Sequence, residues 1–171
     1  MDRLYVTTEN HVLEELRQPL LAWYRENARD LPWRHTSDPY RIWISEIMLQ
    51  QTRVAAVLGY YARFLEAFPT VEALATADEE QLMKLWEGLG YYSRVRNLKK
   101  AAIQIMERHN GIFPRTHAEV SALAGIGPYT SGAICSIAFD LPTPAVDGNV
   151  LRVISRLTDD DTPIEIGRAH V

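Results

Sequence analysis

The feature that most constrains this chain is a glycine-rich turn that runs directly into an apolar helix. Gly125 and Gly127 flank a single apolar residue, and Pro128 follows at once. Glycine accepts positive φ and carries no Cβ, and proline fits the first turn of a helix because its missing N–H would be unpaired there anyway. The pattern predicts a tight turn followed by a helix over residues 129–139. The small apolar residues of this helix indicate close packing on its neighbours.

A turn of this kind presents backbone amides at a helix N-terminus, which is a common way to bind an anion such as phosphate. The chain then passes through Pro142 and Pro144 and reaches Asp147. A phosphate at the turn would thus lie beside a carboxylate. An ordinary helix–turn–helix corner with a solvated aspartate explains the same residues, and this stretch alone does not separate the two interpretations.

Helical spacing, caps and breakers predict an all-α fold for the rest of the chain. Further helices are expected at 12–27, 40–49, 53–67, 71–76, 79–87, 91–109, 119–123 and 149–157. The expected N-caps are Asp38, Thr70, Asp78 and Thr116. Residues 29–34 are expected to be irregular, and Pro19 to lie near the start of the first main helix. We expect a compact two-lobed bundle that forms one domain over residues 1–164, with a helical hairpin at about 118–138.

The composition excludes several classes of protein. The chain has 171 residues and a formal charge of −4, which excludes a polycationic nucleic-acid binder; any DNA contact must come from local patches or backbone amides. Cys135 is the only cysteine, so an intrachain disulfide is excluded and a reducing compartment is indicated. The lack of a signal peptide or long apolar span predicts a cytoplasmic protein. The five histidines lack the spacing of a metal site.

Two carboxyl groups are candidates for chemistry. Glu46 lies on the most apolar helix expected in the chain, where apolar neighbours would raise its pKa and let it hold a proton near neutral pH, as a general acid must. Asp147 would supply a second carboxylate, because glycosyl cleavage uses one carboxyl as proton donor and another beside an oxocarbenium-like sugar. Tyr129 and Asn149 would hydrogen-bond in the same site.

Each carboxyl also has a simpler explanation. Glu46 would occupy the polar side of its helix, near Arg41 and Arg53. Asp147 would cap the helix that begins directly after it. Capping and catalysis at Asp147 are compatible.

The basic residues are unevenly placed. Six of them gather between positions 84 and 108, namely Lys84, Arg94, Arg96, Lys99, Lys100 and Arg108. Tyr91 and Tyr92 lie beside a break at Gly88 and Gly90 in the same region. Cations beside an aromatic ring on a glycine-rich loop suit a DNA backbone with a ring inserted at a base step. A solvated helix face with two packed tyrosines is the more frequent meaning of such a run.

Taken together, these motifs resemble the helix–hairpin–helix DNA glycosylase superfamily and, within it, the MutY-type adenine DNA glycosylases. The resemblance covers about residues 20–157. It rests on five motifs in the family's order, Leu31-Pro-Trp-Arg34, Ser45-Glu-Ile-Met-Leu-Gln-Gln-Thr52, Gly88-Leu-Gly-Tyr-Tyr-Ser-Arg94, Leu123-Ala-Gly-Ile-Gly-Pro-Tyr-Thr130 and Val146-Asp-Gly-Asn-Val150. Each motif alone would be weak, but the ordered set is specific.

The resemblance implies an enzyme of base excision repair that flips adenine mispaired with 8-oxoguanine or guanine out of double-stranded DNA and hydrolyses its N-glycosidic bond. Glu46 then matches the acid that protonates adenine N7, and Asp147, assisted by Tyr129 and Asn149, matches the group that stabilises the sugar cation. The residues that match the adenine pocket are Arg29, Trp33, Arg34, Leu49 and Val54. Those that match contacts to the duplex are Gln51, Thr52, Tyr91, Gly125, Gly127 and Thr130.

Two rival functions stay open. The sister family of endonuclease III-like lyases carries a lysine nucleophile where this chain has Tyr129, so the resemblance favours a monofunctional glycosylase. A non-catalytic helix–hairpin–helix DNA-binding module would keep the hairpin and the basic run but would need neither Glu46 nor Asp147.

The family has segments that this chain lacks. Four cysteines C-terminal to residue 157 ligate a [4Fe–4S] cluster in the family, and Cys135 is not one of them. We therefore expect the cluster, and a domain that recognises 8-oxoguanine, in the full-length protein only, which is expected to be a monomer. Residues 165–171 match no helix signal and are expected to be a non-native tail.

Overall fold

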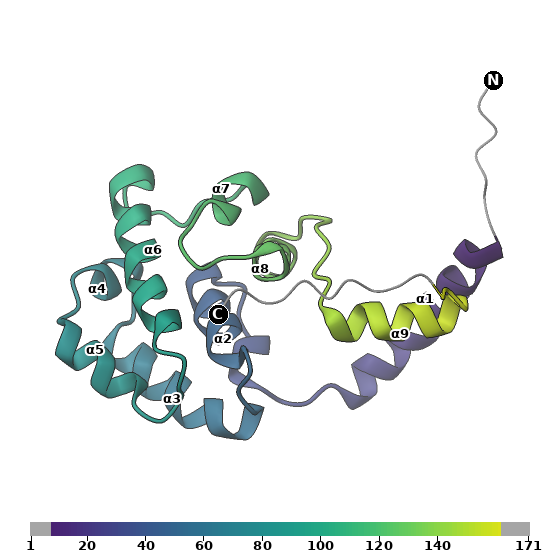
Figure 1. Cartoon of the computed structure of the whole chain (residues 1–171), viewed down its shortest axis with the longest axis horizontal. Helices are drawn as coiled ribbons and strands as arrows, with labels where there is room; N and C mark the ends of the chain where they lie inside the picture. Colours follow the sequence, from purple (N-terminus) through teal and green to yellow (C-terminus); the bar gives the residue numbers. More distant parts are fainter. Residues whose placement is uncertain (1–7, 162–171) are drawn as a thin grey trace. The chain divides into compact units, whose positions relative to one another are not determined.

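The computed structural model describes residues 8–161, and this part of the chain is all helical and contains no β-strand, as the sequence predicts (Figure 1). The elements are α1 (Thr8–Asn27), the 3₁₀ helix η1 (Pro32–Arg34), α2 (Pro39–Leu49), α3 (Val54–Ala67), α4 (Val71–Ala75), α5 (Glu79–Trp86), α6 (Ser93–His109), α7 (His117–Ser121), α8 (Pro128–Phe139) and α9 (Gly148–Thr158). Residues 165–171, expected to be non-native, lie outside the described range.

The expected helix caps are confirmed. The Asp38 carboxylate accepts a hydrogen bond from the Tyr40 amide at 2.9 Å, and Thr70, Asp78 and Thr116 accept one in the same way at the starts of α4, α5 and α7. Each bond satisfies one of the amides that a helix leaves unpaired in its first turn. The local sequence therefore fixes where these four helices begin.

Several boundaries differ from expectation, among them those of α7, which spans His117–Ser121 where 119–123 was expected. Pro19 lies in the middle of α1, which begins at Thr8, so its expected place near the start of the main helix is wrong. Residues 32–34 form a short 3₁₀ helix where irregular structure was expected. Helix α6 begins at Ser93, two residues later than expected, because Tyr91 adopts a φ of +46° that a helix cannot accommodate.

The chain divides into two compact units, in keeping with the expected two lobes. One comprises residues 31–145, with η1 and α2 to α8, and it contains every buried apolar side chain of the described residues. The other comprises the segments before residue 31 and after residue 145, where α1 contacts α9. The expectation of one domain over residues 1–164 stays a prediction.

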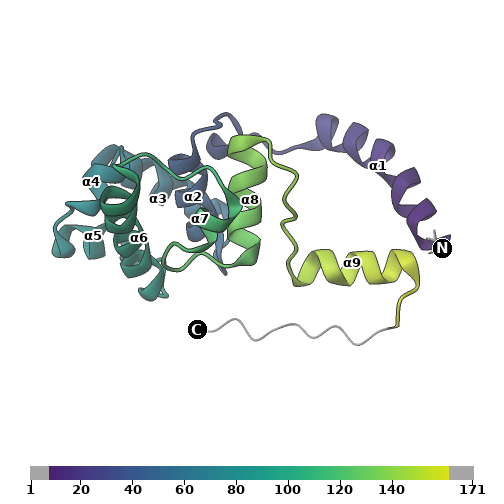
Figure 2. The same ribbon diagram turned by 90° about the horizontal axis from the view of Figure 1, so that it is seen from above.

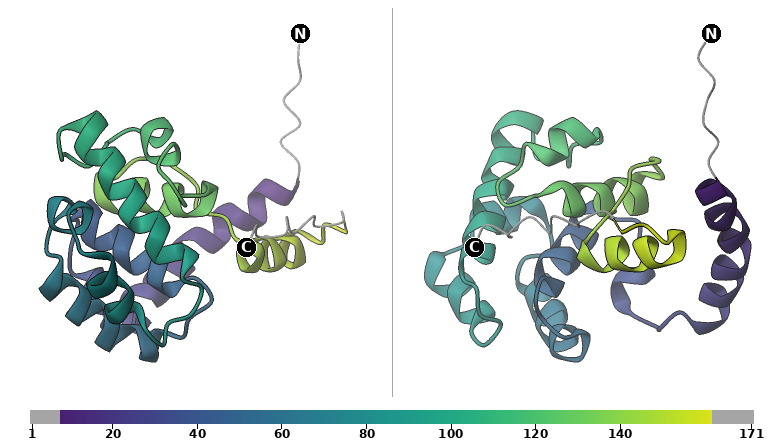
Figure 3. Two further views of the ribbon diagram at one scale, coloured as in Figure 1. Left: turned by 60° about the vertical axis from the view of Figure 1, so that its left-hand side comes forward. Right: turned by 45° about the vertical axis from the view of Figure 1, so that its right-hand side comes forward.

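Helix α2 is the centre of the larger unit. Seven of its eleven residues are buried, and Trp43, Ile44 and Met48 have no exposed surface. It packs against α3, α6 and α8, while α4 packs along α6 (Figure 2). Burying each large apolar side chain contributes about 1.5–3 kcal/mol. Figure 3 shows the same unit from two further sides.

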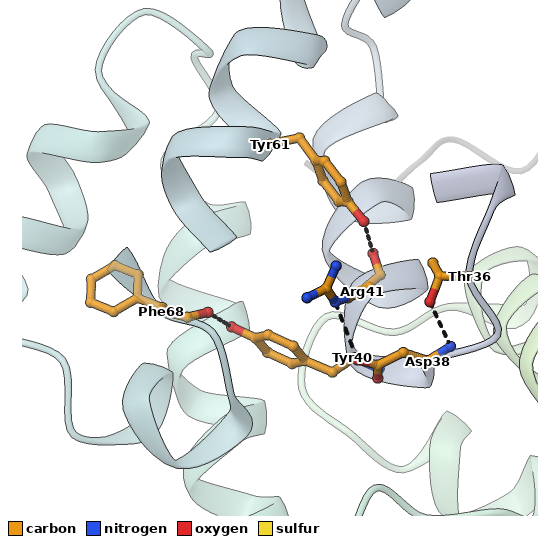
Figure 4. A network of polar contacts seen from close by, with 6 residues as sticks. All are labelled: Thr36, Asp38, Tyr40, Arg41, Tyr61 and Phe68. Carbon is orange, nitrogen blue, oxygen red and sulfur yellow. Dashed lines mark hydrogen bonds and ion pairs between the residues drawn. The ribbon is translucent and has the colours of Figure 1, made fainter. Parts of the chain in front are cut away.

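A polar network anchors the first turn of α2 to α3 and to the residue that follows α3 (Figure 4). The residues drawn are Thr36, Asp38, Tyr40, Arg41, Tyr61 and Phe68. The Tyr40 hydroxyl donates to the Phe68 carbonyl at 2.7 Å, and the Tyr61 hydroxyl donates to the Arg41 carbonyl at 3.3 Å. Burial raises the pKa of Tyr61 to about 12, so its hydroxyl remains a donor near neutral pH.

The single cysteine, Cys135, is fully buried in α8, where it packs as a small core residue and burial raises the pKa of its thiol. Within residues 8–161, no helix has both the length and the apolar composition needed to cross a lipid bilayer.

Candidate functional site

Glu46 lies in the second half of α2, and its side chain is half-buried. Its helix neighbours Ser45 and Ile47 are buried, and Glu46 lies at the edge of this buried part of the helix. Burial raises the pKa of Glu46, because an ionised carboxylate is disfavoured where water is excluded. The carboxyl therefore keeps its proton to a higher pH than an exposed glutamate does. This property suits a proton donor better than a glutamate that only occupies the polar side of its helix.

Asp147 has the opposite environment. It is the N-cap of α9, and its Oδ1 accepts hydrogen bonds from the amides of Asn149 at 3.0 Å and Val150 at 2.9 Å. The Asn149 side-chain amide donates to Oδ2 at 3.1 Å. These bonds, the one from Val150 foremost, lower the pKa of Asp147. The expected cap is confirmed, and the same bonds keep the carboxylate ionised and oriented.

The two carboxyl groups thus have pKa values displaced in opposite directions, Glu46 upward and Asp147 downward. Such a difference allows one carboxyl to donate a proton while the other stays negative at the same pH. Glu46 belongs to the larger unit, and Asp147 and Asn149 belong to the smaller one.

The residues expected to line a pocket differ in exposure. Leu49 ends α2 and Val54 begins α3, and both are half-buried. Trp33 is buried in η1, with its ring packed edge-on against Tyr61 at 5.3 Å between centroids, while Arg34 is exposed. Arg29 lies in the smaller unit.

A tight turn joins α2 to α3. Gln50 has φ −57° and ψ 113°, Gln51 has φ +55°, and the Thr52 amide donates to the Leu49 carbonyl at 3.2 Å. These values describe a type II turn, whose third residue is normally glycine because its φ is positive. An exposed glutamine therefore sits in a conformation that costs a non-glycine residue about 1–2 kcal/mol.

A second strained residue follows α5. Gly88 and Gly90 have φ values of +97° and +71°, and Tyr91 follows with a φ of +46° and a side chain that is 50% exposed. A Cβ at Gly88 would collide with the Tyr60 hydroxyl, which explains the glycine there. The Trp86 indole donates to the Gly90 carbonyl at 3.0 Å and so links this turn to α5.

Arg94 connects these two turns, a role that the sequence pattern does not indicate. The expectation of a basic side chain in a solvated or DNA-facing run is wrong for this residue, because its side chain is only 8% exposed. Its guanidinium donates to carbonyls of both turns. The spacing along α6 could have indicated its burial. Arg94 lies at helical spacing from Leu98, Ala101 and Ile105, which form the buried face of this helix.

The hairpin of α7 and α8 is held by α6. The Ala124 amide donates to the Gln104 side chain at 2.8 Å, and Gly125, with a φ of +74°, packs against Asn97. Positive φ was expected to suit both glycines of this turn, but Gly127 has an extended conformation, with φ −90° and ψ 178°. A Cβ at Gly127 would meet no atom within 4 Å, so the space over this end of α8 is open.

The first turn of α8 carries two further candidate residues. Tyr129 is 40% exposed. Thr130 is buried, and the Gln50 side-chain amide donates to its hydroxyl at 3.4 Å, which ties the end of α2 to the start of α8. The Thr130 hydroxyl is therefore engaged within the fold and is not presented to a ligand. Further along, Gly132 lies against the Pro144 carbonyl, where a Cβ would not fit.

The residues of this chain do not fit an iron–sulfur cluster. Such a cluster takes four cysteine ligands, and the sequence contains one cysteine, which is buried in α8. Among the described residues, no three His, Cys, Asp or Glu side chains are grouped to hold a metal ion.

Comparison with known proteins gives consistent matches. A family model described as "HhH-GPD superfamily base excision DNA repair protein" matches residues 44–168. An adenine DNA glycosylase of Mus musculus is 47% identical over 150 residues, which are 82% of this chain but 29% of that protein. The chain therefore spans less than a third of the length of this relative.

Two solved structures resemble the fold. A thermostable thymine-DNA glycosylase has a TM-score of 0.81 and 30% identity, over 87% of this chain and 69% of that one. Endonuclease III in a non-covalent DNA complex has a TM-score of 0.70 and 25% identity, over 86% of this chain and 68% of that one.

The two glycines of the hairpin turn should respond differently to alanine. We expect Gly125→Ala to lower the free energy of unfolding by about 1–3 kcal/mol, because alanine would be strained at this φ and its Cβ would press on Asn97. Gly127→Ala should change it by less than about 1 kcal/mol, since alanine adopts an extended backbone freely. Urea denaturation followed by circular dichroism measures both. Equal losses would contradict the geometry of this turn.

Proposed function

The chain belongs to the HhH-GPD superfamily of base excision DNA repair proteins, and from this premise we propose that it is the catalytic part of an adenine DNA glycosylase. The substrate is adenine mispaired with 8-oxoguanine or guanine in double-stranded DNA. The half-buried Glu46 with its raised pKa carries the proposal, since base release needs an acid. The 47% identity to an adenine DNA glycosylase supports the choice of base.

The chemistry requires the adenine to leave the base stack. An extruded base costs a few kcal/mol, and least at a mispair. Glu46 donates its proton to adenine N7, the C1′–N9 bond breaks, and the bonding electron pair leaves with the base. The sugar becomes an oxocarbenium-like cation, to which the Asp147 carboxylate is complementary. Water then adds to C1′ and gives its proton to the Glu46 carboxylate, which leaves an abasic site and restores the acid.

Asn149 and Tyr129 assist the second half of this reaction. The Asn149 side chain already donates to Asp147 Oδ2 at 3.1 Å, so it orients the carboxylate before substrate arrives. A carboxylate held by amides needs no rearrangement when positive charge develops, so its electrostatic stabilisation of the cation is preorganised. Tyr129 is exposed at the start of α8, and its hydroxyl is assigned a hydrogen bond in the same site as Asp147 and Asn149.

We assign the extruded adenine to the surface beside Glu46. Leu49 lies one helical turn after Glu46 and, with Val54, presents partly exposed apolar surface on which a purine ring can pack. The buried Trp33 is assigned to the same pocket, and Arg29 and Arg34 are assigned as donors for the polar edge of the base.

We assign duplex binding to three turns. The open space over Gly127 and the amides at the start of α8 suit a DNA phosphate. The exposed, left-handed residues Gln51 and Tyr91 are assigned to the interior of the duplex near the mispair, with Thr52 beside them. Gly125 gives the hairpin turn its conformation, and the backbone of Thr130 is assigned to the same phosphate contact.

The remaining expectations concern the longer protein. We propose that it works on DNA in the cytoplasm as a monomer. A [4Fe–4S] cluster in it takes its cysteine ligands from outside this chain, because the single cysteine here does not fit the group.

We expect Glu46→Gln in the full-length protein to lower the single-turnover rate of adenine release at least 100-fold, because glutamine has no acidic proton. Binding to the mispaired duplex should survive in a mobility-shift assay. In the parent protein, the rate should fall as the pH rises through the raised pKa of Glu46, since the acid must be protonated. An active Glu46→Gln protein would refute the assignment.

The same substitution separates activity from stability. Ionisation of a half-buried carboxyl with a raised pKa destabilises the fold as pH rises from the unfolded pKa to the folded one. Glu46→Gln removes that penalty, so its melting temperature at pH 8 should at least equal that of the parent protein. A large loss of stability would instead give Glu46 a structural role.

Asp147→Asn tests the negative charge without removing the cap. Asparagine caps helices about as well as aspartate, so the unfolding free energy should change by no more than about 1 kcal/mol. The rate of adenine release should fall about 100-fold or more, because the sugar cation loses its anion. Thermal melting and single-turnover kinetics measure the two effects. A rate that follows stability alone would assign Asp147 to capping only.

A lyase is the nearest alternative, given the likeness to endonuclease III. A lyase nucleophile is an amine, and the second residue of α8 is Tyr129. We expect borohydride to trap no covalent complex with abasic DNA, as judged by denaturing electrophoresis beside endonuclease III as positive control. A trapped band from the parent protein would overturn the monofunctional assignment.

A further inference from the structure

We propose that Arg94 is a positioning residue that holds Gln51 and Tyr91 as one rigid pair, so that both meet the duplex together when the base is extruded; this rests on the proposed function. The two residues come from turns about 40 positions apart in sequence, one after α2 and one before α6. A side chain that binds both turns can fix the spacing between them.

The guanidinium of Arg94 makes these connections directly. Its Nη1 donates to the carbonyls of Ile47 at 3.0 Å, Met48 at 3.1 Å and Gln50 at 2.7 Å, and to the Thr52 hydroxyl at 3.3 Å. Its Nη2 donates to the carbonyls of Leu89 at 2.9 Å and Gly90 at 3.1 Å. One planar group therefore binds the end of α2, its turn and the turn before Tyr91.

Arg94 binds the peptide groups that directly precede the two residues with positive φ. Gln50 immediately precedes Gln51, and Gly90 immediately precedes Tyr91, so Arg94 binds the carbonyl next to each strained residue. The guanidinium also lies 5.6 Å from the centre of the Tyr91 ring and 5.3 Å from that of Trp86. Backbone strain persists only where surrounding contacts over-determine it, and Arg94 supplies such contacts to both residues.

Other left-handed residues have local explanations that these two lack. Within residues 8–161, the remaining non-glycine residues with positive φ are Asn110, Asp140 and Asp159, and each directly ends a helix. Asparagine and aspartate adopt this conformation readily. Gln51 and Tyr91 have no such preference, and they share one partner.

The chemistry of the contact argues against simple core filling. The acceptors of Arg94 within residues 8–161 are backbone carbonyls and one hydroxyl, with no carboxylate among them, and its Nε is buried without a hydrogen-bond partner. Burying a charge without a counter-ion is unfavourable compared with an apolar side chain of the same size. A residue kept for stability alone would not need this charge, whereas a fork that binds two turns does.

Arg94→Met in the full-length protein tests the proposal with two duplexes. In one, the target adenine is paired with 8-oxoguanine; in the other, the same adenine lies unpaired in a bulge, where extrusion requires little energy. We expect the single-turnover rate of adenine release to fall about 100-fold on the mispair, but by less than about fivefold on the bulge. The fluorescence rise of 2-aminopurine beside the target base, which reports unstacking, should be lost in parallel.

Leu74→Ala is the matched control, because Leu74 is fully buried in α4 and its truncation destabilises the same unit without touching either turn. At a temperature where it is folded, its rates on the two duplexes should change by one common factor. Arg94→Lys keeps the charge but not the planar fork, so it should show the mispair-selective loss in weaker form. It serves as the test variant if Arg94→Met does not fold.

The outcomes separate the two levels of inference. A loss of the same factor on both duplexes for the Arg94 variants, or no loss on the mispair, overturns the positioning role. A parent protein that releases adenine from neither duplex overturns the proposed function itself.

Discussion

The burial of α2 is the constraint on which the rest of the structure depends. Its apolar residues form the middle of the larger unit, and Glu46 is one of the side chains at the margin of this core. The packing that stabilises the fold is thus also the cause of the raised pKa. Several buried side chains, each worth about 1.5–3 kcal/mol, offset the cost of one desolvated carboxyl. An acid in this position cannot be moved to the surface without losing the environment that makes it an acid.

The two carboxyl groups show how the same chemical group can receive opposite properties from helices. Glu46 is on the body of a buried helix, where water is excluded and no backbone amide is free to stabilise charge. Asp147 precedes α9, where the unpaired amides of the first turn favour the anion. The difference follows from position along a helix, since the causes are desolvation at Glu46 and hydrogen bonds at Asp147. The proposed division between proton donor and anion therefore follows from ordinary helix physics.

Most of the secondary structure could be predicted from the sequence because its signals are local. A cap such as Asp38 and its helix start lie within three residues of each other, so the pattern alone is decisive. The role of Arg94 could not be predicted in this way, because a basic residue in a basic run has no sequence neighbour that shows it binding a turn more than 40 positions earlier. Gly127 differed from expectation because glycine does not specify which of its many conformations a turn uses. The hydrogen bond between the Thr130 hydroxyl and Gln50 likewise joins positions 80 residues apart, which no local pattern indicates.

Stability and function make different demands on the turns that follow α2 and α5. Glycine at positions 51 and 91 would relieve the positive φ, yet the chain has glutamine and tyrosine there, and it buries an arginine charge beneath them. Each choice lowers stability in isolation. Together they place two large, exposed side chains on backbones that have little freedom left, which suits the proposed insertion into a base stack, since a flexible backbone would lose conformational entropy on insertion. Under the proposed function, the strain in the two turns and the buried guanidinium are parts of one arrangement, in which a local conformational cost fixes the geometry of the two residues assigned to the duplex.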